Sequence, residues 1–233
     1  MSLPQLTAPE FVTKVPSTGK EIKYRPFLVR EEKILLMALE GGDEKEIGNA
    51  ITNILSSCII SKIDIDSLAT FDVEYLFLKL RSKSVGEVIE LKLAHSDKET
   101  ECKHRTDVVI NIDDVKVSDN VSDGKIDLNG ELGIKLRYAG MNDVNSLDTN
   151  STSQLFELVV SCVEYIYDAS EVYDDFTRDE MSKWLEQLDT AQFKMITDFF
   201  QAAPKLSHTI EWTCPECGEK DSLVLEGMQS FFM

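Results

Sequence analysis

The sequence predicts an α+β protein in which helical clusters pack around a pair of β-hairpins. Two observations support this prediction. Short runs with period-two alternation flank a Cys-Lys-His segment at 102–104 and a Cys-Pro-Glu-Cys-Gly segment at 214–218. Elsewhere apolar residues recur at helical spacing, with the longest such run over 43–59.

The segment near the C-terminus has the pattern of half a zinc ribbon. Cys214 and Cys217 stand between strand-like runs at 209–212 and 223–225. Cys-x-x-Cys spacing allows both sulfurs to bind one tetrahedral ion. Gly218 can adopt the positive φ that the exit from such a turn often needs. This segment supplies two ligands, and a structural zinc requires four.

The other two ligands are expected from the upstream hairpin, where alternating runs at 89–93 and 108–112 flank the Cys-Lys-His segment. The two hairpins would then clamp one zinc with three cysteines and a histidine, which makes the pair zinc-ribbon-like. The predicted metal ligands are Cys102, His104, Cys214 and Cys217. Because Cys-x-His is a tighter spacing than usual, His95 and His208 stay open as substitutes for His104.

A free cysteine pair or a redox dithiol is the alternative for Cys214 and Cys217. A thioredoxin-like motif opens a helix after a strand, whereas here a strand is expected to follow. Four protein ligands leave no open position for water, so the predicted zinc is structural. It would tie the chain near residue 102 to the chain near residue 214.

Composition limits the possible functions. The 233 residues include 42 acidic and 24 basic side chains, for a net charge of −18, which opposes direct binding to nucleic acid phosphates. No apolar run approaches the roughly 20 residues of a membrane span, and no signal peptide is expected. Five cysteines, an odd number, suit a reducing cytosol, and Cys58 and Cys162 are predicted to be buried.

The predicted organisation is an extended N-terminal arm over 1–20, one α+β domain over 21–227 and an apolar tail over 228–233. The hairpins are placed near 87–117 and 207–227. The other expected elements, in chain order, are a strand at 21–25, helices at 31–39, 43–59 and 72–80, strand-like runs at 126–128 and 134–136, a helix from a cap at Thr149–Ser151 through Val163 and Ile166, a helix from a Thr177–Glu180 capping box, and a helix through 193–200 ended by Pro204.

Catalytic motifs are absent from the sequence: it has no P-loop, dinucleotide-binding glycine motif, His-Glu-x-x-His or Gly-x-Ser-x-Gly. With 42 carboxylates, acidic pairs are inevitable and therefore not diagnostic. The sequence predicts a protein that is not an enzyme.

The N-terminal region carries a resemblance to a known family. Lys14–Lys20, Tyr24–Lys33 and Leu36–Glu40 resemble the opening signature of the T4-type bacteriophage baseplate protein family, in its hub subunit group. The Cys-Pro-x-Cys-Gly segment with a Phe-rich end is similar too. Where the family shows paired Cys knuckles, this chain has Cys102-x-His104 in the first.

The resemblance implies a non-enzymatic component of the phage tail baseplate, either a resident of the hub or an assembly factor. Its expected partners are other baseplate and hub proteins, and its expected location is the virion, after synthesis in the bacterial host cytoplasm. The arm and the Phe231–Phe232 tail are candidate docking elements, the tail alternatively packing on the chain's own core. A cellular zinc-ribbon adaptor is the alternative function; the mostly acidic residues around Cys214 and Cys217 do not favour it.

Overall fold

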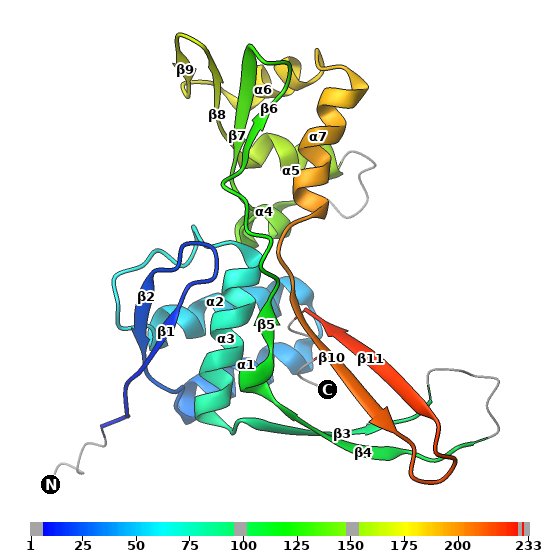
Figure 1. Cartoon of the computed structure of the whole chain (residues 1–233). Helices are drawn as coiled ribbons and strands as arrows, with labels where there is room; N and C mark the ends of the chain where they lie inside the picture. Colours follow the sequence, from blue (N-terminus) through cyan, green and yellow to red (C-terminus); the bar gives the residue numbers. More distant parts are fainter. Residues whose placement is uncertain (1–6, 96–101, 148–153, 228–229, 231–233) are drawn as a thin grey trace, which may run out of the picture. The chain divides into compact units, whose positions relative to one another are not determined.

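The computed structural model describes residues 7–95, 102–147, 154–227 and 230. Figure 1 shows helices and small antiparallel sheets, so the predicted α+β class is confirmed. In chain order the elements are β1 (Phe11–Lys14), β2 (Glu21–Tyr24), α1 (Val29–Gly41), α2 (Glu44–Cys58), α3 (Thr70–Ser84), β3 (Val88–Leu93), β4 (Thr106–Asn111), the 3₁₀ turn η1 (Ile112–Asp114), β5 (Lys116–Val117), β6 (Lys125–Asp127), β7 (Leu132–Leu136), α4 (Met141–Ser146), α5 (Gln154–Cys162), β8 (Val163–Asp168), β9 (Val172–Tyr173), α6 (Arg178–Leu185), α7 (Thr190–Gln201), β10 (Leu206–Thr213) and β11 (Lys220–Glu226).

The chain divides into two compact units. Unit 1 consists of 1–65, 71–118 and 205–233, and unit 2 of 66–70 and 119–204. The sequence predicted one domain over 21–227; its boundaries stay a prediction, because backbone packing does not by itself show which segments fold independently.

Unit 1 begins with a hairpin that includes part of the predicted arm. Strand β1 pairs antiparallel with β2, and Val15 after it is fully buried. The turn between the strands contacts the start of α3: Ser17 donates from its backbone N–H (2.8 Å) and its hydroxyl (2.5 Å) to the buried carboxylate of Asp72. Residues 7–20 are therefore anchored to the unit, while residues 1–6 lie outside the described residues.

Helix α2 of unit 1 begins where its capping residue indicates. Asp43 caps α2 by accepting hydrogen bonds from the backbone N–H groups of Lys45 and Glu46, as the sequence predicted. Helix α3 is buried on more than one face rather than along a single stripe. Its buried residues are Phe71, Asp72, Val73, Leu76, Phe77, Leu78, Leu80 and Ser82.

Both long hairpins of unit 1 are present. Strand β3 pairs with β4 so that Leu91 faces Val108, and β10 pairs with β11 so that Ile210 faces Leu223. Strand β5 adds to the other edge of β10. Figure 1 shows the two hairpins running side by side and converging at their tips. They share one core, formed by Leu78, Ile89, Ile110, Ile112, Val115, Leu206, Ile210, Trp212 and Leu225.

Unit 2 is a four-stranded antiparallel sheet, in the order β6-β7-β8-β9, packed with helices. Its buried core contains Leu128, Ile134, Leu136, Val159, Val160, Val163, Ile166, Met181, Leu185, Ile196 and Phe199. The capping box predicted for α6 is present: Thr177 accepts from the N–H of Glu180, whose carboxylate accepts from Thr177.

One predicted helix is shorter than expected. The apolar spacing predicts that Val163 and Ile166 belong to the same helix as Leu155, but α5 ends at Cys162 and both residues belong to β8. Val163 pairs with Leu136 and Ile166 with Ile134, so sheet pairing overrides the helical spacing. The cap predicted at 149–151 lies outside the described residues.

Candidate metal centre

The tip of the β10–β11 hairpin presents the Cys-x-x-Cys pair. The N–H of Cys214 donates to the carbonyl of Glu219 at 2.8 Å, and the N–H of Gly218 donates to the carbonyl of Cys214 at 2.9 Å. Gly218 has a φ of +76°, a conformation that glycine adopts at little cost. The turn thus presents the thiols of Cys214 and Cys217 together at the tip of the hairpin. A strand, β11, follows this turn rather than a helix.

The tip of the β3–β4 hairpin supplies the other polar side chains. Strand β3 ends at Leu93, and His95 follows two residues later. Cys102 lies on the segment that returns to β4, which begins at Thr106. Residues 96–101 between them lie outside the described residues.

Four side chains meet where these tips converge. His95, Cys102, Cys214 and Cys217 each offer one ligand atom, and these atoms all lie within 4.8 Å of one another. The Sγ atoms of Cys102 and Cys214 are 3.8 Å apart, and Sγ of Cys217 is 3.4 Å from Nε2 of His95. Each of these two short distances joins one hairpin to the other. This cluster could hold a metal ion.

The donor set and its spacing can be compared with ordinary zinc geometry. Zinc binds sulfur at ~2.3 Å and nitrogen at ~2.05 Å, so a tetrahedral site sets two sulfurs ~3.8 Å apart and a sulfur and a nitrogen ~3.5 Å apart. The Cys102–Cys214 sulfur distance of 3.8 Å and the Cys217–His95 sulfur–nitrogen distance of 3.4 Å lie close to these values. Three thiols and an imidazole are also the donor types of structural zinc sites.

The thiol environment favours a thiolate at one position. Backbone N–H groups of Cys217 and Glu216 donate toward the sulfur of Cys214 and lower its pKa to about 6, with help from the Cys217 and His95 side chains. The pKa of Cys217 is raised instead. A hydrogen bond from the Glu219 backbone lowers it, but burial and the thiols of Cys214 and Cys102 outweigh that effect. A divalent cation would relieve the repulsion between neighbouring thiolates.

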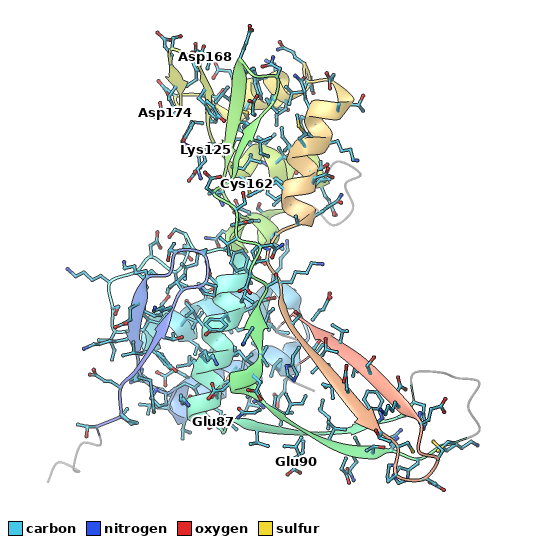
Figure 2. All side chains as sticks on the ribbon, viewed as in Figure 1. Glu87, Glu90, Lys125, Cys162, Asp168 and Asp174 are labelled. Carbon is cyan, nitrogen blue, oxygen red and sulfur yellow. The ribbon has the colours of Figure 1, made fainter. Side chains whose placement is uncertain are left out.

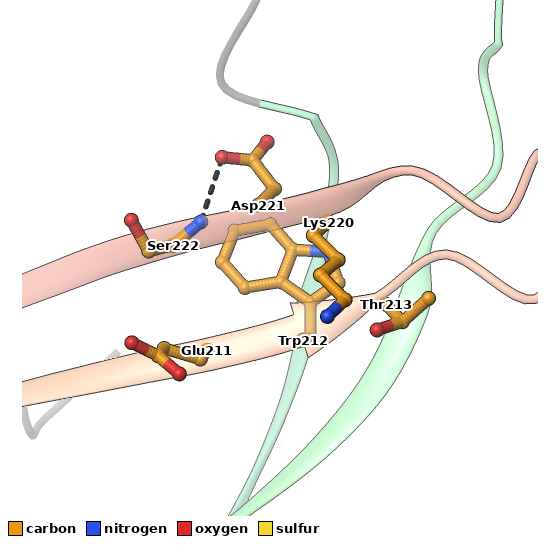
Figure 3. A pocket seen from close by; sticks show the side chains of 6 residues that line it. All are labelled: Glu211, Trp212, Thr213, Lys220, Asp221 and Ser222. Carbon is orange, nitrogen blue, oxygen red and sulfur yellow. Dashed lines mark hydrogen bonds between the residues drawn. The ribbon is translucent and has the colours of Figure 1, made fainter.

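A carboxylate stands behind the imidazole. Oδ2 of Asp221 lies 3.8 Å from Nδ1 of His95, whose side chain is only 5% exposed. The other oxygen, Oδ1, accepts the N–H of Ser222 at 2.8 Å. Asp221 also lines a cavity of about 560 Å³ on the hairpin (Figure 3), together with Glu211, Trp212, Thr213, Lys220 and Ser222.

The remaining predicted ligand and its other substitute lie elsewhere. Nδ1 of His104 is 3.1 Å from a carboxylate oxygen of Glu216, and His104 is not one of the four clustered residues. His208 is in β10, opposite Leu225. The structure therefore brings Cys102, Cys214 and Cys217 together with His95 rather than with His104 or His208.

The other two cysteines are core residues, as the sequence predicted. Cys58 and Cys162 are fully buried, and burial raises the pKa of each thiol to about 11. Neither contributes to the cluster. At neutral pH both are protonated and act as small apolar side chains.

The fold and the site define a mixed α+β protein whose two hairpin tips meet in a candidate metal centre. The family model described as T4 bacteriophage base plate protein matches residues 8–233, and the chain belongs to this family. The family resemblance predicted from the N-terminal segments is confirmed.

A curated relative matches over nearly the same extent. The chain is 23% identical over 225 residues to the baseplate hub assembly protein gp26 of Enterobacteria phage T4, covering 96% of this chain and 98% of the relative. No solved structure matches the chain. Among the described residues, no helix has both the length and the apolar character needed to span a membrane.

Proposed function

We propose that this protein is a non-enzymatic structural or assembly component of the baseplate hub of a contractile phage tail. The observation that carries the proposal is the family match across residues 8–233. The relative's description as a hub assembly protein favours a role in assembly. Its partners would be other baseplate proteins and its place the virion tail baseplate, reached after synthesis in the host cytoplasm. The net charge of −18 also favours protein partners over nucleic acid.

We further propose that His95, Cys102, Cys214 and Cys217 bind one structural zinc ion. Zinc bound there would join residues 112 positions apart, Cys102 and Cys214, at the tips of two hairpins whose bases already share a core. In the chain-entropy model, a covalent cross-link that closes a loop of roughly 100 residues stabilises a fold by up to about 4.7 kcal/mol. The metal would thereby fix the relative position of the hairpins in a compartment where disulfides do not persist.

The assembly role is tested by infecting host cells with phage that cannot make this protein. Phage lacking a functional gene for this protein should yield tail precursors without complete hubs in electron micrographs, and supplying the protein from a plasmid should restore them. Normal hubs without the protein would refute the role. Mass spectrometry of finished virions separates the two forms of the proposal: a resident component is retained and an assembly factor is absent.

The zinc proposal is tested separately on purified protein. Protein prepared without chelator should carry one zinc per chain by native mass spectrometry, and Cys102→Ser and Cys217→Ser should each lose it. These two variants change different hairpins. Zinc retained by Cys102→Ser would show that Cys102 is not one of the ligands, and zinc retained by Cys102→Ser combined with His95→Ala would show that the two hairpins are not joined through the metal.

A further inference from the structure

Unit 2 contains a cavity that the metal centre does not explain. It has a volume of about 380 Å³ and lies among residues of β7, β8, β9, the segment after β9 and helix α6. Ligand pockets in proteins commonly have volumes of about 300–1,000 Å³. The lining residues are Leu132, Ile166, Asp168, Tyr173, Asp175, Phe176, Glu180, Met181 and Trp184.

The lining divides into an apolar interior and an acidic rim. Ile166 and Met181 are buried core residues, and Trp184 packs half-buried against the same core. Asp175 and Glu180 are exposed to solvent. No lysine or arginine is among these described lining residues. The cavity is therefore apolar within and negative at its mouth.

Two of the rim carboxylates are held in place by the chain. Asp168 accepts the N–H groups of Ser170 and Glu171 at 2.7 and 2.8 Å and the hydroxyl of Tyr173 at 2.9 Å. Glu180 accepts the N–H of Thr177 at 2.8 Å within the capping box of α6. Figure 2 labels Asp168, which lines the cavity, and Asp174, which follows β9 and does not line it. Fixed carboxylates need little reorganisation to meet a cation.

From this charge complementarity we propose that the cavity docks a segment of a protein partner in which a lysine or arginine stands next to an apolar side chain. The apolar side chain would enter the cavity and the cation would lie at the rim of Asp168, Asp175 and Glu180. Aromatic rings in the lining, such as Trp184, also attract cations. The inference rests on the assembly role proposed above, because it supplies that role with one surface and one class of partner segment.

The two tryptophans of the chain allow a direct test. Trp184 lines the cavity, and Trp212 lies in the core of unit 1, so their indole N–H signals in ¹⁵N NMR spectra report on the two units separately. The probe is the peptide acetyl-Gly-Ser-Leu-Arg-Leu-Ser-Gly-amide, with glutamine in place of arginine as its neutral counterpart. We expect the arginine peptide to shift the Trp184 signal and leave the Trp212 signal in place.

Matched variants test the rim. Asp175→Asn with Glu180→Gln removes two lining charges, and glutamine can still accept the capping hydrogen bond from Thr177. The control, Asp174→Asn with Asp179→Asn, removes the two charges that directly precede Asp175 and Glu180 in the chain and do not line the cavity. The first double variant should weaken binding of the arginine peptide roughly three- to tenfold, as expected for two exposed ion pairs, and the second by less than twofold.

Each other outcome overturns the proposal. Equal binding of the neutral peptide would mean that the cavity takes an apolar segment without charge selection. Equal weakening by both double variants would assign binding to the general negative field of unit 2. Concentration-dependent broadening of the Trp184 signal without peptide would indicate that a second copy of the chain occupies the cavity. A shift of Trp212 alone, or of neither signal, would place no docking site there.

The peptide experiment and the infection experiment can fail separately, so the cavity inference and the assembly role are distinguishable. If phage lacking the protein fail to form hubs but the arginine peptide does not bind, the role stands and the cavity inference fails. If the peptide binds and hubs form normally without the protein, the cavity binds basic segments but the assembly role fails.

Discussion

Nε2 of His95 lies 3.4 Å from Sγ of Cys217, although the two residues are 122 positions apart in the chain. The other ring nitrogen, Nδ1, faces Asp221 at 3.8 Å. The imidazole thus stands between a thiol of one hairpin tip and a carboxylate of the strand that follows it. This arrangement makes His95 the histidine placed to complete the proposed zinc site, and Asp221 the residue placed to orient it.

The two candidate histidines give opposite expectations. His95→Ala removes a ligand atom from the cluster, so zinc affinity should fall at least tenfold, as for loss of a metal ligand or its support. His104→Ala should keep one zinc per chain, because His104 lies against Glu216 outside the cluster. Competition with a chromophoric chelator measures both affinities. Loss of zinc only in His104→Ala would restore the ligand set predicted from the sequence.

Asp221→Asn tests the support of the histidine. Without the carboxylate, the imidazole loses the group that favours a proton on Nδ1 and leaves Nε2 free for the metal, so zinc affinity should fall about 10–100-fold. Asp107→Asn, an exposed carboxylate on β4, is the matched control and should have no effect. The same chelator competition applies, and an unchanged affinity in Asp221→Asn would show that the 3.8 Å contact does not orient the ring.

A buried ion pair in unit 1 should make stability depend on acid pH. Glu31 is 4% exposed and accepts hydrogen bonds from Arg25 (2.9 Å), Arg30 (2.6 Å) and the N–H of Leu28 (2.7 Å). Burial alone would raise the pKa of Glu31, but these donors lower it to about 2 from an ordinary 4.5. The stabilisation is therefore complete above about pH 4.5 and is lost as pH falls toward 2.

Urea unfolding at pH 6 and pH 3 measures this contribution. At pH 6, Glu31→Gln should lower the free energy of unfolding by about 1–3 kcal/mol, allowing for the 1.36 kcal/mol that each pKa unit represents. At pH 3 the difference in unfolding free energy between Glu31→Gln and the unsubstituted protein should be smaller. Glu32→Gln, an exposed neighbour on α1, should change stability by less than about 0.5 kcal/mol at either pH. A constant difference at both pH values would contradict the linkage.

Two glycines of unit 2 separate backbone strain from steric conflict. Gly124 and Gly130 have φ values of +74° and +83°, so alanine is strained at either. A Cβ at Gly130 meets nothing within 4 Å, whereas a Cβ at Gly124 would lie 2.1 Å from the carbonyl oxygen of Leu136. Gly130→Ala should cost about 1 kcal/mol of unfolding free energy and Gly124→Ala about 2–4 kcal/mol. Equal costs in thermal unfolding would show that the backbone moves aside at Gly124.

Elements with local signals in the amino-acid sequence can be predicted without the structure. Alternation around 102–104 and 214–218 predicted both hairpins, because side chains of a strand alternate between its faces. The Cys-x-x-Cys spacing predicted that the thiols of Cys214 and Cys217 lie close together. Asp43 and Thr177 indicated where helices begin, because a capping side chain accepts hydrogen bonds from backbone N–H groups no more than three residues later.

The relations between distant segments depend on how the chain packs in three dimensions. Val163 and Ile166 continue a helical pattern but belong to β8, because pairing with β7 outweighs local periodicity. The histidine of the cluster also depends on packing: the sequence predicts His104, with His95 and His208 as substitutes, whereas the structure places His95 in the cluster. His104 and His95 are each close to Cys102 in sequence, and the convergence of two hairpins, set by their shared core, places His95 beside Cys217 and His104 beside Glu216. The distance between two side chains that are 122 residues apart depends on tertiary packing, and the spacing of neighbouring residues in the sequence does not predict it.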